Sequence, residues 1–338
     1  MRLGDCCKTN LHTYSDKEKW SLIRYLDTGS ITEGRIDEIQ TLYPGVDKIP
    51  SRARRKASVG DILFSTVRPN QKHYGIIEAG TENLLVSTGF TVVTVDTTIA
   101  DPYFIYYYLT QSSVIESLQA IAEQSTSTYP SIKPSDIEDI ELDLPELETQ
   151  KKIGSTLRML DRKIALNEEI NDNLEQQAQS YFQELFVDNA DPEWTTGTIS
   201  DLGTVVGGST PSKAKPEYYT ESGIAWITPK DLSNNKSKFV SHGENDITEL
   251  GLRNSSASIM PEGTVLFSSR APIGYIAIAA GEVTTNQGFK SVVPKPEIGT
   301  PFVYFFLKNT LPVIEGMASG STFKEVSGST MKNVPAVI

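Results

Sequence analysis

The hydrophobic pattern of this chain is most regular between Ile153 and Leu185, where one position recurs at alternating spacings of four and three residues. That spacing is the a/d seam of a heptad repeat, held for more than four heptads with one glycine, Gly154, and no proline. The seam positions are Ile153, Leu157, Leu160, Ile164, Asn167, Asn171, Leu174, Ala178, Tyr181 and Leu185. The pattern predicts a coiled-coil-type helix from about Leu147 to Phe186, roughly 60 Å long.

Eight of the ten seam residues are apolar, and the exceptions are the two central asparagines. A buried Asn on a seam costs stability but fixes register and partner choice. Something must cover such a stripe: a second copy of this chain, helices of partner subunits, or a flanking domain folded back over it. For the free protein we expect a homodimer through the seam, with Asn167 and Asn171 setting the register. A single amphipathic core helix of an ordinary domain would show a similar stripe.

The segments on either side of this helix repeat one plan, which favours two domains over one. Seven short matches follow in the same order, with an offset that drifts between 203 and 194 residues. The matched segments are Leu3–Asp5 with Leu202–Thr204, Tyr25–Ile31 with Trp226–Leu232, Gly60–Thr66 with Gly263–Ser269, Gly89-Phe90 with Gly288-Phe289, Pro102–Tyr106 with Pro301–Tyr304, Ser127–Tyr129 with Ser321–Phe323, and Ile132 with Val326. We interpret this as a collinear duplication with small insertions and deletions.

The predicted fold class is α+β, with two homologous mixed α/β domains joined by the long helix. The domains span residues 1–145 and 188–338, and the helix spans 146–187. Within the first domain, the β-branched and aromatic runs Asp61–Ser65 and Phe90–Val95 predict strands. Pro102–Ser117 predicts one helix that opens with an Asp101 cap and a proline in its first turn.

The net charge of −12 at first argues against a nucleic-acid partner, but its distribution changes that view. Residues 136–193 hold 16 acidic and 5 basic residues, so this segment carries −11 and the rest of the chain only −1. No apolar run approaches the ~18 residues of a membrane span, and the N-terminus does not open a signal peptide, so we expect a cytoplasmic protein with no membrane partner. Cys6 and Cys7 predict no disulfide framework, and no Cys/His spacing predicts a metal site.

Two diverged copies on a heptad helix resemble the specificity (S) subunit of type I restriction-modification systems. Local motifs agree with this resemblance over essentially the whole chain. They are Gly207–Lys213, Glu217–Tyr219, Trp226–Leu232, Ser269–Gly274 and Thr285–Lys290 in the second copy, and Pro50–Lys56 and Ser65–His73 in the first. One departure is that Leu144 aligns with Ile338, so the second conserved helix of that family is expected to be missing.

The resemblance implies that each domain is a target-recognition domain that reads half of a split double-stranded DNA target, with the helix spacing the two. The chain itself would be non-catalytic and would hold no cofactor. Methyltransferase (M) subunits using S-adenosylmethionine would methylate adenine, and an ATP-driven restriction (R) subunit would cut the DNA.

Cations suited to phosphate contact and base readout occur in both copies. In the first copy the candidates are Arg52, Arg54, Arg55, Lys56, Arg68, Lys72 and His73, and in the second copy they are Lys213, Lys215, Lys230, Arg253, Arg270, Lys290 and Lys324. Arg270 ranks first in the second copy because it follows a predicted strand in a loop bounded by proline and glycine. Gly207 and Gly208 would let the backbone approach a phosphate closely. Tyr129 and Phe323 are aromatic candidates in polar loops, although packing aromatics and solvated basic loops would look the same.

Three motifs resemble those of enzymes. Asp27-Thr28-Gly29 fits the triplet of aspartic peptidases, in which two aspartates share a proton, but the other copy has Thr228 there. A homodimeric peptidase with one Asp27 per chain is the enzymatic alternative, and a free-standing two-headed DNA-binding regulator is the non-enzymatic one. Asp101–Phe104 resembles an amino-methyltransferase motif without its second proline, and Gly208–Lys213 lacks the spacing of a nucleotide-binding P-loop.

Overall fold

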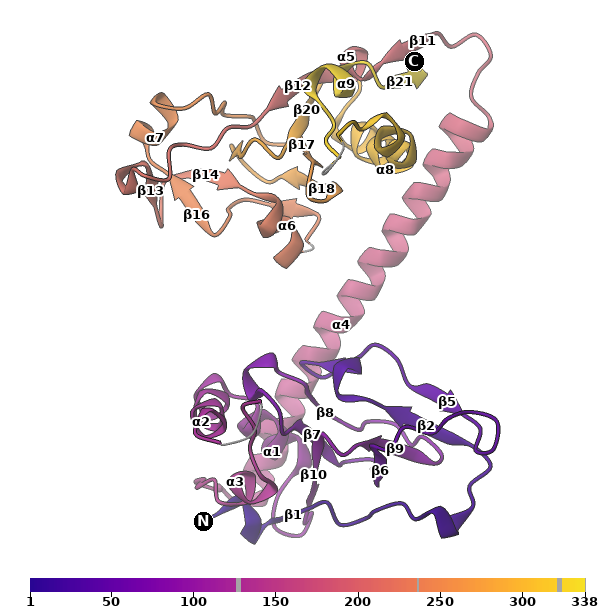
Figure 1. Cartoon of the computed structure of the whole chain (residues 1–338), viewed down its shortest axis with the longest axis vertical. Helices are drawn as coiled ribbons and strands as arrows, with labels where there is room; N and C mark the ends of the chain where they lie inside the picture. Colours follow the sequence, from indigo (N-terminus) through magenta and orange to yellow (C-terminus); the bar gives the residue numbers. More distant parts are fainter. Residues whose placement is uncertain (126–128, 236, 321–323, 338) are drawn as a thin grey trace. The chain divides into compact units, whose positions relative to one another are not determined.

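The computed structural model describes residues 1–125, 129–235, 237–320 and 324–337. The chain divides into two compact units, Met1–Glu169 and Ile170–Ile338, each built from mixed sheets and helices (Figure 1). This agrees with the predicted α+β class. No helix among the described residues is long and apolar enough to cross a membrane.

The first unit is layered around a four-stranded sheet in the order β1-β10-β7-β8. These strands are β1 Cys7–Thr9, β10 Phe90–Val95, β7 Ile62–Ser65 and β8 Tyr74–Ile76. On one side of it pack the helices α1 Pro102–Leu109, α2 Ser112–Glu123 and α3 Pro134–Glu138. On the other side lies a second sheet in the order β5-β2-β9-β6, with a small hairpin beside it. Those strands are β5 Gln40–Leu42, β2 Ile23–Leu26, β9 Leu84–Ser87, β6 Ala53–Lys56, and in the hairpin β3 Ile31–Thr32 and β4 Arg35–Ile36.

The second unit has the same layers. Its main sheet has the order β12-β20-β17-β18-β15 and its second sheet the order β13-β16-β14-β19. The strands are β12 Gly203–Gly207, β20 Lys290–Pro294, β17 Val265–Ser269, β18 Ile273–Ala279, β15 Phe239–Val240, β13 Tyr219–Thr220, β16 Asn245–Ile247, β14 Ile224–Ile227 and β19 Thr284–Thr285, with a further pair, β11 Thr196–Thr198 and β21 Pro335–Val337. The helices are α5 Ile199–Leu202, α6 Pro229–Asn234, α7 Glu249–Arg253, α8 Thr300–Met317 and α9 Gly328–Lys332.

The duplication predicted from the sequence is seen in the strand order of the main sheet and in the parallel pair of the second sheet. The order β1-β10-β7-β8 recurs as β12-β20-β17-β18, and the parallel pair β2 and β9 recurs as the parallel pair β14 and β19. The cores repeat as well, because side chains alternate across a strand. Ile62 and Phe64 of β7 face the helices while Leu63 faces the second sheet, and Val265, Phe267 and Leu266 of β17 do the same.

The predicted strands Asp61–Ser65 and Phe90–Val95 are confirmed as β7 and β10, but the prediction of one helix over Pro102–Ser117 is wrong. The Asp101 side chain does cap α1 by accepting from the Phe104 N–H at 2.9 Å. However, α1 ends at Leu109, where the Thr110 hydroxyl donates back to the Tyr106 carbonyl at 3.0 Å. Gln111 then takes an extended conformation and α2 begins at Ser112. The break follows from the competition of a threonine hydroxyl for helix carbonyls.

The long helix is confirmed as α4, Leu147–Gln183, followed by a π-helical turn at Glu184–Asp188. Its first turns are held within the first unit by Gln150, which is 1% exposed. The Gln150 amide donates to the carbonyls of Pro145 (2.7 Å) and Ile99 (3.3 Å) and accepts from the Asp101 N–H (3.0 Å). Gly154 then lets the helix approach α1, because a Cβ there would lie 2.5 Å from Asp101 Oδ1 and 2.9 Å from the Phe104 nitrogen.

Within the second unit, Glu175 anchors the same helix. Its carboxylate accepts from the Tyr304 hydroxyl at 2.9 Å and pairs with Lys238 at 2.7 Å and with Lys308. Burial alone would raise the pKa of Glu175, but these hydrogen bonds outweigh it and lower the pKa to about 2. Phe182, also buried, packs its ring 5.4 Å from that of Phe302.

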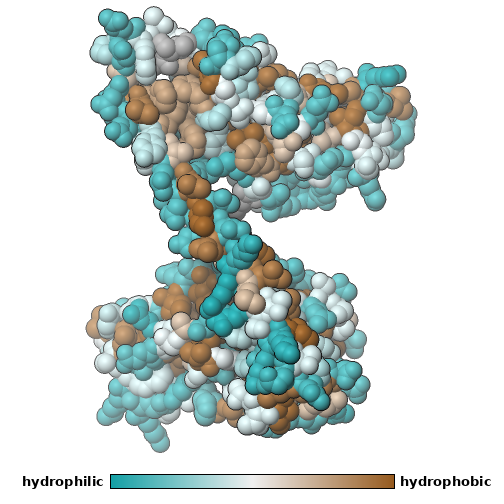
Figure 2. All heavy atoms as spheres, turned by 180° about the vertical axis from the view of Figure 1, so that it is seen from behind, coloured by the Kyte–Doolittle hydropathy of each residue, from teal (hydrophilic) through white to brown (hydrophobic). Residues whose placement is uncertain are grey.

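Most of the predicted seam is exposed. The side chains of Ile153, Leu160, Ile164, Leu174, Tyr181 and Leu185 are between 40% and 62% exposed, and Asn167 and Asn171 are exposed as well. Met159, Leu166 and Ile170, which the heptad assignment left out, are exposed beside them. In Figure 2 apolar side chains gather along one side of the exposed part of α4 and polar ones along the other.

Replacing Gly154 with alanine separates packing from helix propensity. Propensity alone would stabilise the helix by about 1 kcal/mol. The close approach of Asp101 and the Phe104 backbone predicts instead a loss of about 1–3 kcal/mol in the free energy of unfolding of the first unit. The matched control is Gly316→Ala in α8, where an added Cβ meets nothing within 4 Å and stability should not fall. Urea denaturation of both variants measures the difference; a stabilised Gly154→Ala protein would contradict the packing.

Glu175 predicts a pH dependence. Its pKa is below the ordinary value of 4.5, so the carboxylate stabilises the fold above about pH 4.5, and this stabilisation is lost as the pH falls toward 2. Glu175→Gln should therefore lower the free energy of unfolding by about 1–2 kcal/mol at pH 7, a figure reduced for the partly exposed lysines. The gap to wild type should shrink between pH 4.5 and pH 3 in urea titrations. The exposed Glu184→Gln serves as control, and a gap that stays constant with pH would exclude this role.

Candidate nucleic-acid interface

One loop is anchored identically in both units, where the chain leaves β7 or β17. In the first unit the Thr66 N–H donates to the Gly89 carbonyl at 2.8 Å, and the Ile132 N–H donates to the Thr66 carbonyl at 2.9 Å. In the second unit the Ser269 N–H donates to the Gly288 carbonyl at 2.7 Å, and the Val326 N–H donates to the Ser269 carbonyl at 2.9 Å. The loop is therefore held on one side by the turn that precedes β10 or β20. On the other side it is held by the segment that contains Ile132 or Val326.

The next residues of the two loops also correspond. Val67 forms a β-bridge with Ser131, and Arg270 forms one with Glu325. Arg68 and Ala271 follow them, both with a φ of 48°, and each precedes a proline. A positive φ is uncommon for residues other than glycine, so both copies share this unusual φ, although the following peptide bond is cis at Ala271-Pro272 and not at Arg68-Pro69.

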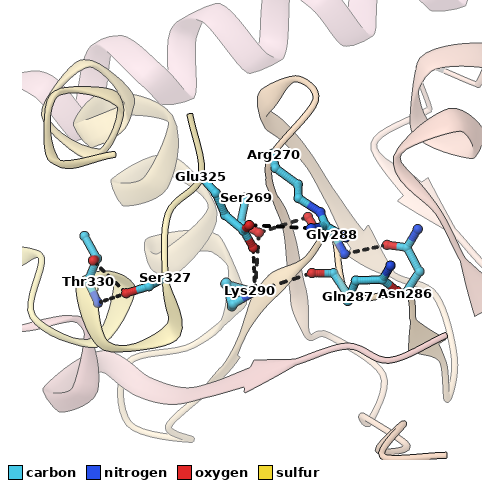
Figure 3. A network of polar contacts seen from close by, with 9 residues as sticks. All are labelled: Ser269, Arg270, Asn286, Gln287, Gly288, Lys290, Glu325, Ser327 and Thr330. Atoms are coloured by element: carbon cyan, nitrogen blue, oxygen red, sulfur yellow. Dashed lines mark hydrogen bonds and ion pairs between the residues drawn. The ribbon is translucent and has the colours of Figure 1, made fainter. Parts of the chain in front are cut away.

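In the second unit this loop brings together two of the predicted cations and one acid (Figure 3). Arg270 Nη1 lies 3.5 Å from one carboxylate oxygen of Glu325, and Lys290 Nζ lies 3.7 Å from the other. Lys290 also lies 3.5 Å from Ser269 Oγ and 3.4 Å from the Gln287 carbonyl. Its side chain is only 15% exposed, and burial lowers its pKa below the ordinary value. We call Arg270, Lys290 and Glu325 the charge cluster.

The turn Asn286–Gly288 connects the charge cluster to the Gly207–Pro211 loop. The Thr210 hydroxyl contacts the Gln287 side chain, and the Ser209 N–H donates to the Thr285 carbonyl at 2.9 Å. A Cβ at Gly208 would lie 1.9 Å from the Asn286 carbonyl oxygen. Gly208 is therefore needed for a close approach of two backbone segments. The sequence predicts a phosphate contact at this glycine, whereas the structure shows a role in packing.

The other predicted cations of the second unit do not join the charge cluster. Lys215 pairs with Glu217 at 3.7 Å and Lys230 pairs with Glu244 at 2.6 Å, both beside the second sheet. Lys213, Arg253 and Lys324 are exposed. Phe323 lies outside the described residues.

In the first unit the predicted basic loop is partly a strand. Arg54, Arg55 and Lys56 belong to β6, which pairs with β9 across a bulge between Ala53 and Arg55, and Arg52 is exposed just before it. Burial lowers the pKa of Arg55. Lys56 pairs with Glu18 at 2.5 Å, and its ammonium group lies 5.2 Å from the centre of the Trp20 ring. These contacts give Lys56 a structural role within the first unit.

The remaining candidates of the first unit have local partners. The Arg68 guanidinium lies 5.2 Å from the centre of the Tyr129 ring, a cation–π contact at the anchored loop. Lys72 pairs with Glu33 at 2.5 Å. His73 Nδ1 lies 2.7 Å from the Ile31 carbonyl oxygen, so this ring helps to hold the small hairpin.

Two features were missed from the sequence. The role of Glu325 is not evident from the sequence beside the basic Lys324. The available signal is its alignment with Ser131, which marks a position where the two copies differ in charge. A cavity of about 450 Å³ in the first unit is lined by aromatic, proline and basic residues. They include Tyr14, Lys19, Trp20, Pro44, Pro50 and Arg54, and the aromatic and basic residues between Tyr14 and Trp20 were the available signal.

Asp27, the acid of the peptidase triplet, has a local hydrogen-bond partner in the structure. Asp27 accepts a hydrogen bond from the Tyr25 hydroxyl at 2.8 Å. At the corresponding place in the second unit Thr228 directly precedes α6, and its hydroxyl donates to Asp231 at 2.6 Å. Among the described residues, no group of three or more His, Cys, Asp or Glu side chains could hold a metal ion.

Comparisons with known proteins place this architecture in a family. The specificity subunit of the type I restriction enzyme MjaIX from Methanocaldococcus jannaschii is 42% identical over 46% of this chain, and the match spans 36% of that subunit. The HindI specificity subunit from Haemophilus influenzae is 25% identical over 95% of this chain and 84% of its own length. A solved structure of a type I restriction-modification S subunit from M. genitalium has the same fold, with a TM-score of 0.58 and 16% identity over all of this chain and 83% of that one.

The model of the type I restriction modification DNA specificity domain matches this sequence twice, over residues 47–176 and 192–336. The two matches lie on the two copies that the sheets and the anchored loops define independently. This chain therefore belongs to the family of type I restriction modification DNA specificity domains, of which it contains two copies.

Proposed function

We propose that this chain is the DNA sequence-recognition subunit of a type I restriction-modification complex, and that each unit reads one half of a bipartite target. The observation that carries this proposal is the duplication of a family DNA specificity domain with a shared frame and different surfaces. Both units have the same sheets and the same anchored loop, but the side chains that the loop presents differ. A common frame with unlike contact residues is what two readers of unlike sequences require.

The charge distribution supports DNA as the partner. The acidic residues that dominate the net charge lie in residues 136–193, mainly on α4 and its approaches. Exposed cations such as Arg52, Arg68, Lys213 and Lys324 lie outside that segment, where they are available for phosphate contacts. In the charge cluster the side chain of Arg270 is 37% exposed and offers a guanidinium for base readout.

We assign the chemistry of the complex to partner subunits. The chain would dock methyltransferase subunits that use S-adenosylmethionine, and an ATP-driven restriction subunit would act through the same complex in the cytoplasm. This chain would be non-catalytic and without a cofactor of its own. The exposed apolar stripe of α4 supports a helical partner, because eight apolar side chains are exposed along this one helix and a partner surface would cover them. That cover would come from the methyltransferase subunits or, in the free protein, from a second copy of this chain.

A domain exchange tests the function. Residues 1–140 are replaced with the first domain of another family member, and the chain is expressed with its methyltransferase subunits. Sequencing of methylated DNA should show that one half-site has changed and the other has not, because each unit has its own core and its own loops. The reciprocal exchange of residues 188–338 is the control and should change the other half-site. Loss of both half-sites in either well-folded chimaera would refute two independent readers.

The homodimer is tested by sedimentation of the free chain at micromolar concentration. Leu160→Asp with Ile164→Asp places two charges on the exposed stripe and should convert a dimer into a monomer. Ala165→Asp with Gln176→Asp adds the same charge at exposed positions on the other side of the helix and should leave the dimer intact. A wild-type monomer, or a dimer indifferent to the stripe variant, would contradict this partner.

A further inference from the structure

The two anchored loops differ in charge at three corresponding positions. Arg270, Glu325 and Lys290 of the second unit stand where the first unit has Val67, Ser131 and Thr91. The β-bridges fix the first two correspondences. The third follows from the buried phenylalanines that precede Thr91 and Lys290, because Phe90 pairs with Ser65 and Phe289 with the equivalent Ser268.

The charge cluster is not a closed ion pair. Its two cation–carboxylate contacts are 3.5 and 3.7 Å long, whereas Lys230 and Glu244 in the same unit lie 2.6 Å apart. Charge-assisted N–H···O bonds usually measure about 2.7–2.9 Å. One carboxylate is thus shared between two cations, which leaves a local net charge of +1. The side chains of Arg270 and Glu325 are 37% and 39% exposed, so the cluster opens to solvent.

The position of Arg270 is fixed by backbone rather than by its own side chain. The preceding residue, Ser269, is completely buried, and its backbone N–H and carbonyl are both hydrogen-bonded. Arg270 itself forms a β-bridge with Glu325. A guanidinium held in this way can present two parallel N–H donors, the pattern that matches the O6 and N7 acceptors of guanine. Val67, 36% exposed at the corresponding place, has no donor and offers methyl groups, which suit the C5-methyl of thymine.

We infer that the position occupied by Arg270 in one unit and Val67 in the other is a specificity-determining contact of each reader. Arg270 reads a guanine in the major groove, with Glu325 and Lys290 as positioning residues, and Val67 contacts a thymine methyl group. This inference rests on the proposed function and names the chemistry of its site. The same frame thus presents a hydrogen-bond donor in one half-site and an apolar surface in the other.

The test uses the full chain with its methyltransferase subunits and a pool of randomised DNA duplexes. The wild-type complex selects a bipartite sequence, and single-position variants of it are then compared. Arg270→Val should lower the preference for guanine at one base pair of one half-site by about 5- to 150-fold and leave the other half-site unchanged. Lys295→Ala removes one exposed cation just past the other end of β20 and should change no position. If Arg270→Val fails to fold, Arg270→Gln, which removes both the charge and the guanidinium fork, should show the same loss of guanine preference.

Two further variants separate positioning from structure. Glu325→Gln raises the local charge from +1 to +2, so affinity for unselected duplexes should rise while guanine preference falls; a merely structural glutamate would lower both. In the other half-site, replacing one thymine with uracil should weaken binding by the wild type and not by Val67→Ser, which has no methyl group to contact thymine.

The outcomes are distinguishable. If Arg270→Val weakens all duplexes equally and reduces the salt dependence by about one ion, Arg270 contacts phosphate and the inference is wrong. If uracil substitution weakens binding by the wild type and by Val67→Ser equally, the thymine contact is wrong. A wild-type complex that selects no sequence would overturn the proposed function itself.

Discussion

The structure depends on one constraint: the helix α4 contributes residues to both units, and each unit holds a polar side chain of the helix by hydrogen bonds from its own groups. In the first unit Gln150 bonds to three backbone groups and Gly154 removes the side chain that would block α1. In the second unit Glu175 accepts a hydrogen bond from a tyrosine hydroxyl and forms ion pairs with two lysines. Left unsatisfied, the buried Gln150 amide would cost about 1–3 kcal/mol, so the identity of this residue is constrained by the unit that holds it.

On that support the family domain appears twice with a rigid frame and variable side chains. Strands β7 and β17 alternate the same residues between helix layer and second sheet, and both end in a loop held by the same two backbone hydrogen bonds. Backbone bonds do not depend on side-chain identity, so Val67 can stand where Arg270 stands without a change of fold. Specificity can diverge between copies because the frame is built from groups that substitution leaves in place.

The sequence was enough to predict α4 and the strands β7 and β10, because these depend on regular spacing of apolar residues. It was also enough to predict the duplication, because short sequence motifs recur in the same order. It failed where a side chain competed with the backbone, as Thr110 does at the end of α1. The sequence also did not reveal charge partners that lie far apart in the chain. Glu325 contacts Arg270, 55 residues away, and Glu18 pairs with Lys56, 38 residues away. A count of basic residues could not tell Lys230, which is paired, from Arg270, which is only loosely held.

The seam shows the same limit in another form. At Asn167 and Asn171 the heptad positions are polar, but Leu166 and Ile170 precede them and are exposed, as is Met159 one heptad before Leu166. The apolar stripe therefore shifts sideways in the middle of the helix instead of stopping. A shift of this kind locally changes the winding that a strict heptad would impose. A partner that covers Leu160, Ile164, Leu166, Ile170 and Leu174 together has to follow this shift, so the two asparagines and their apolar neighbours select a partner surface that an uninterrupted seam would not.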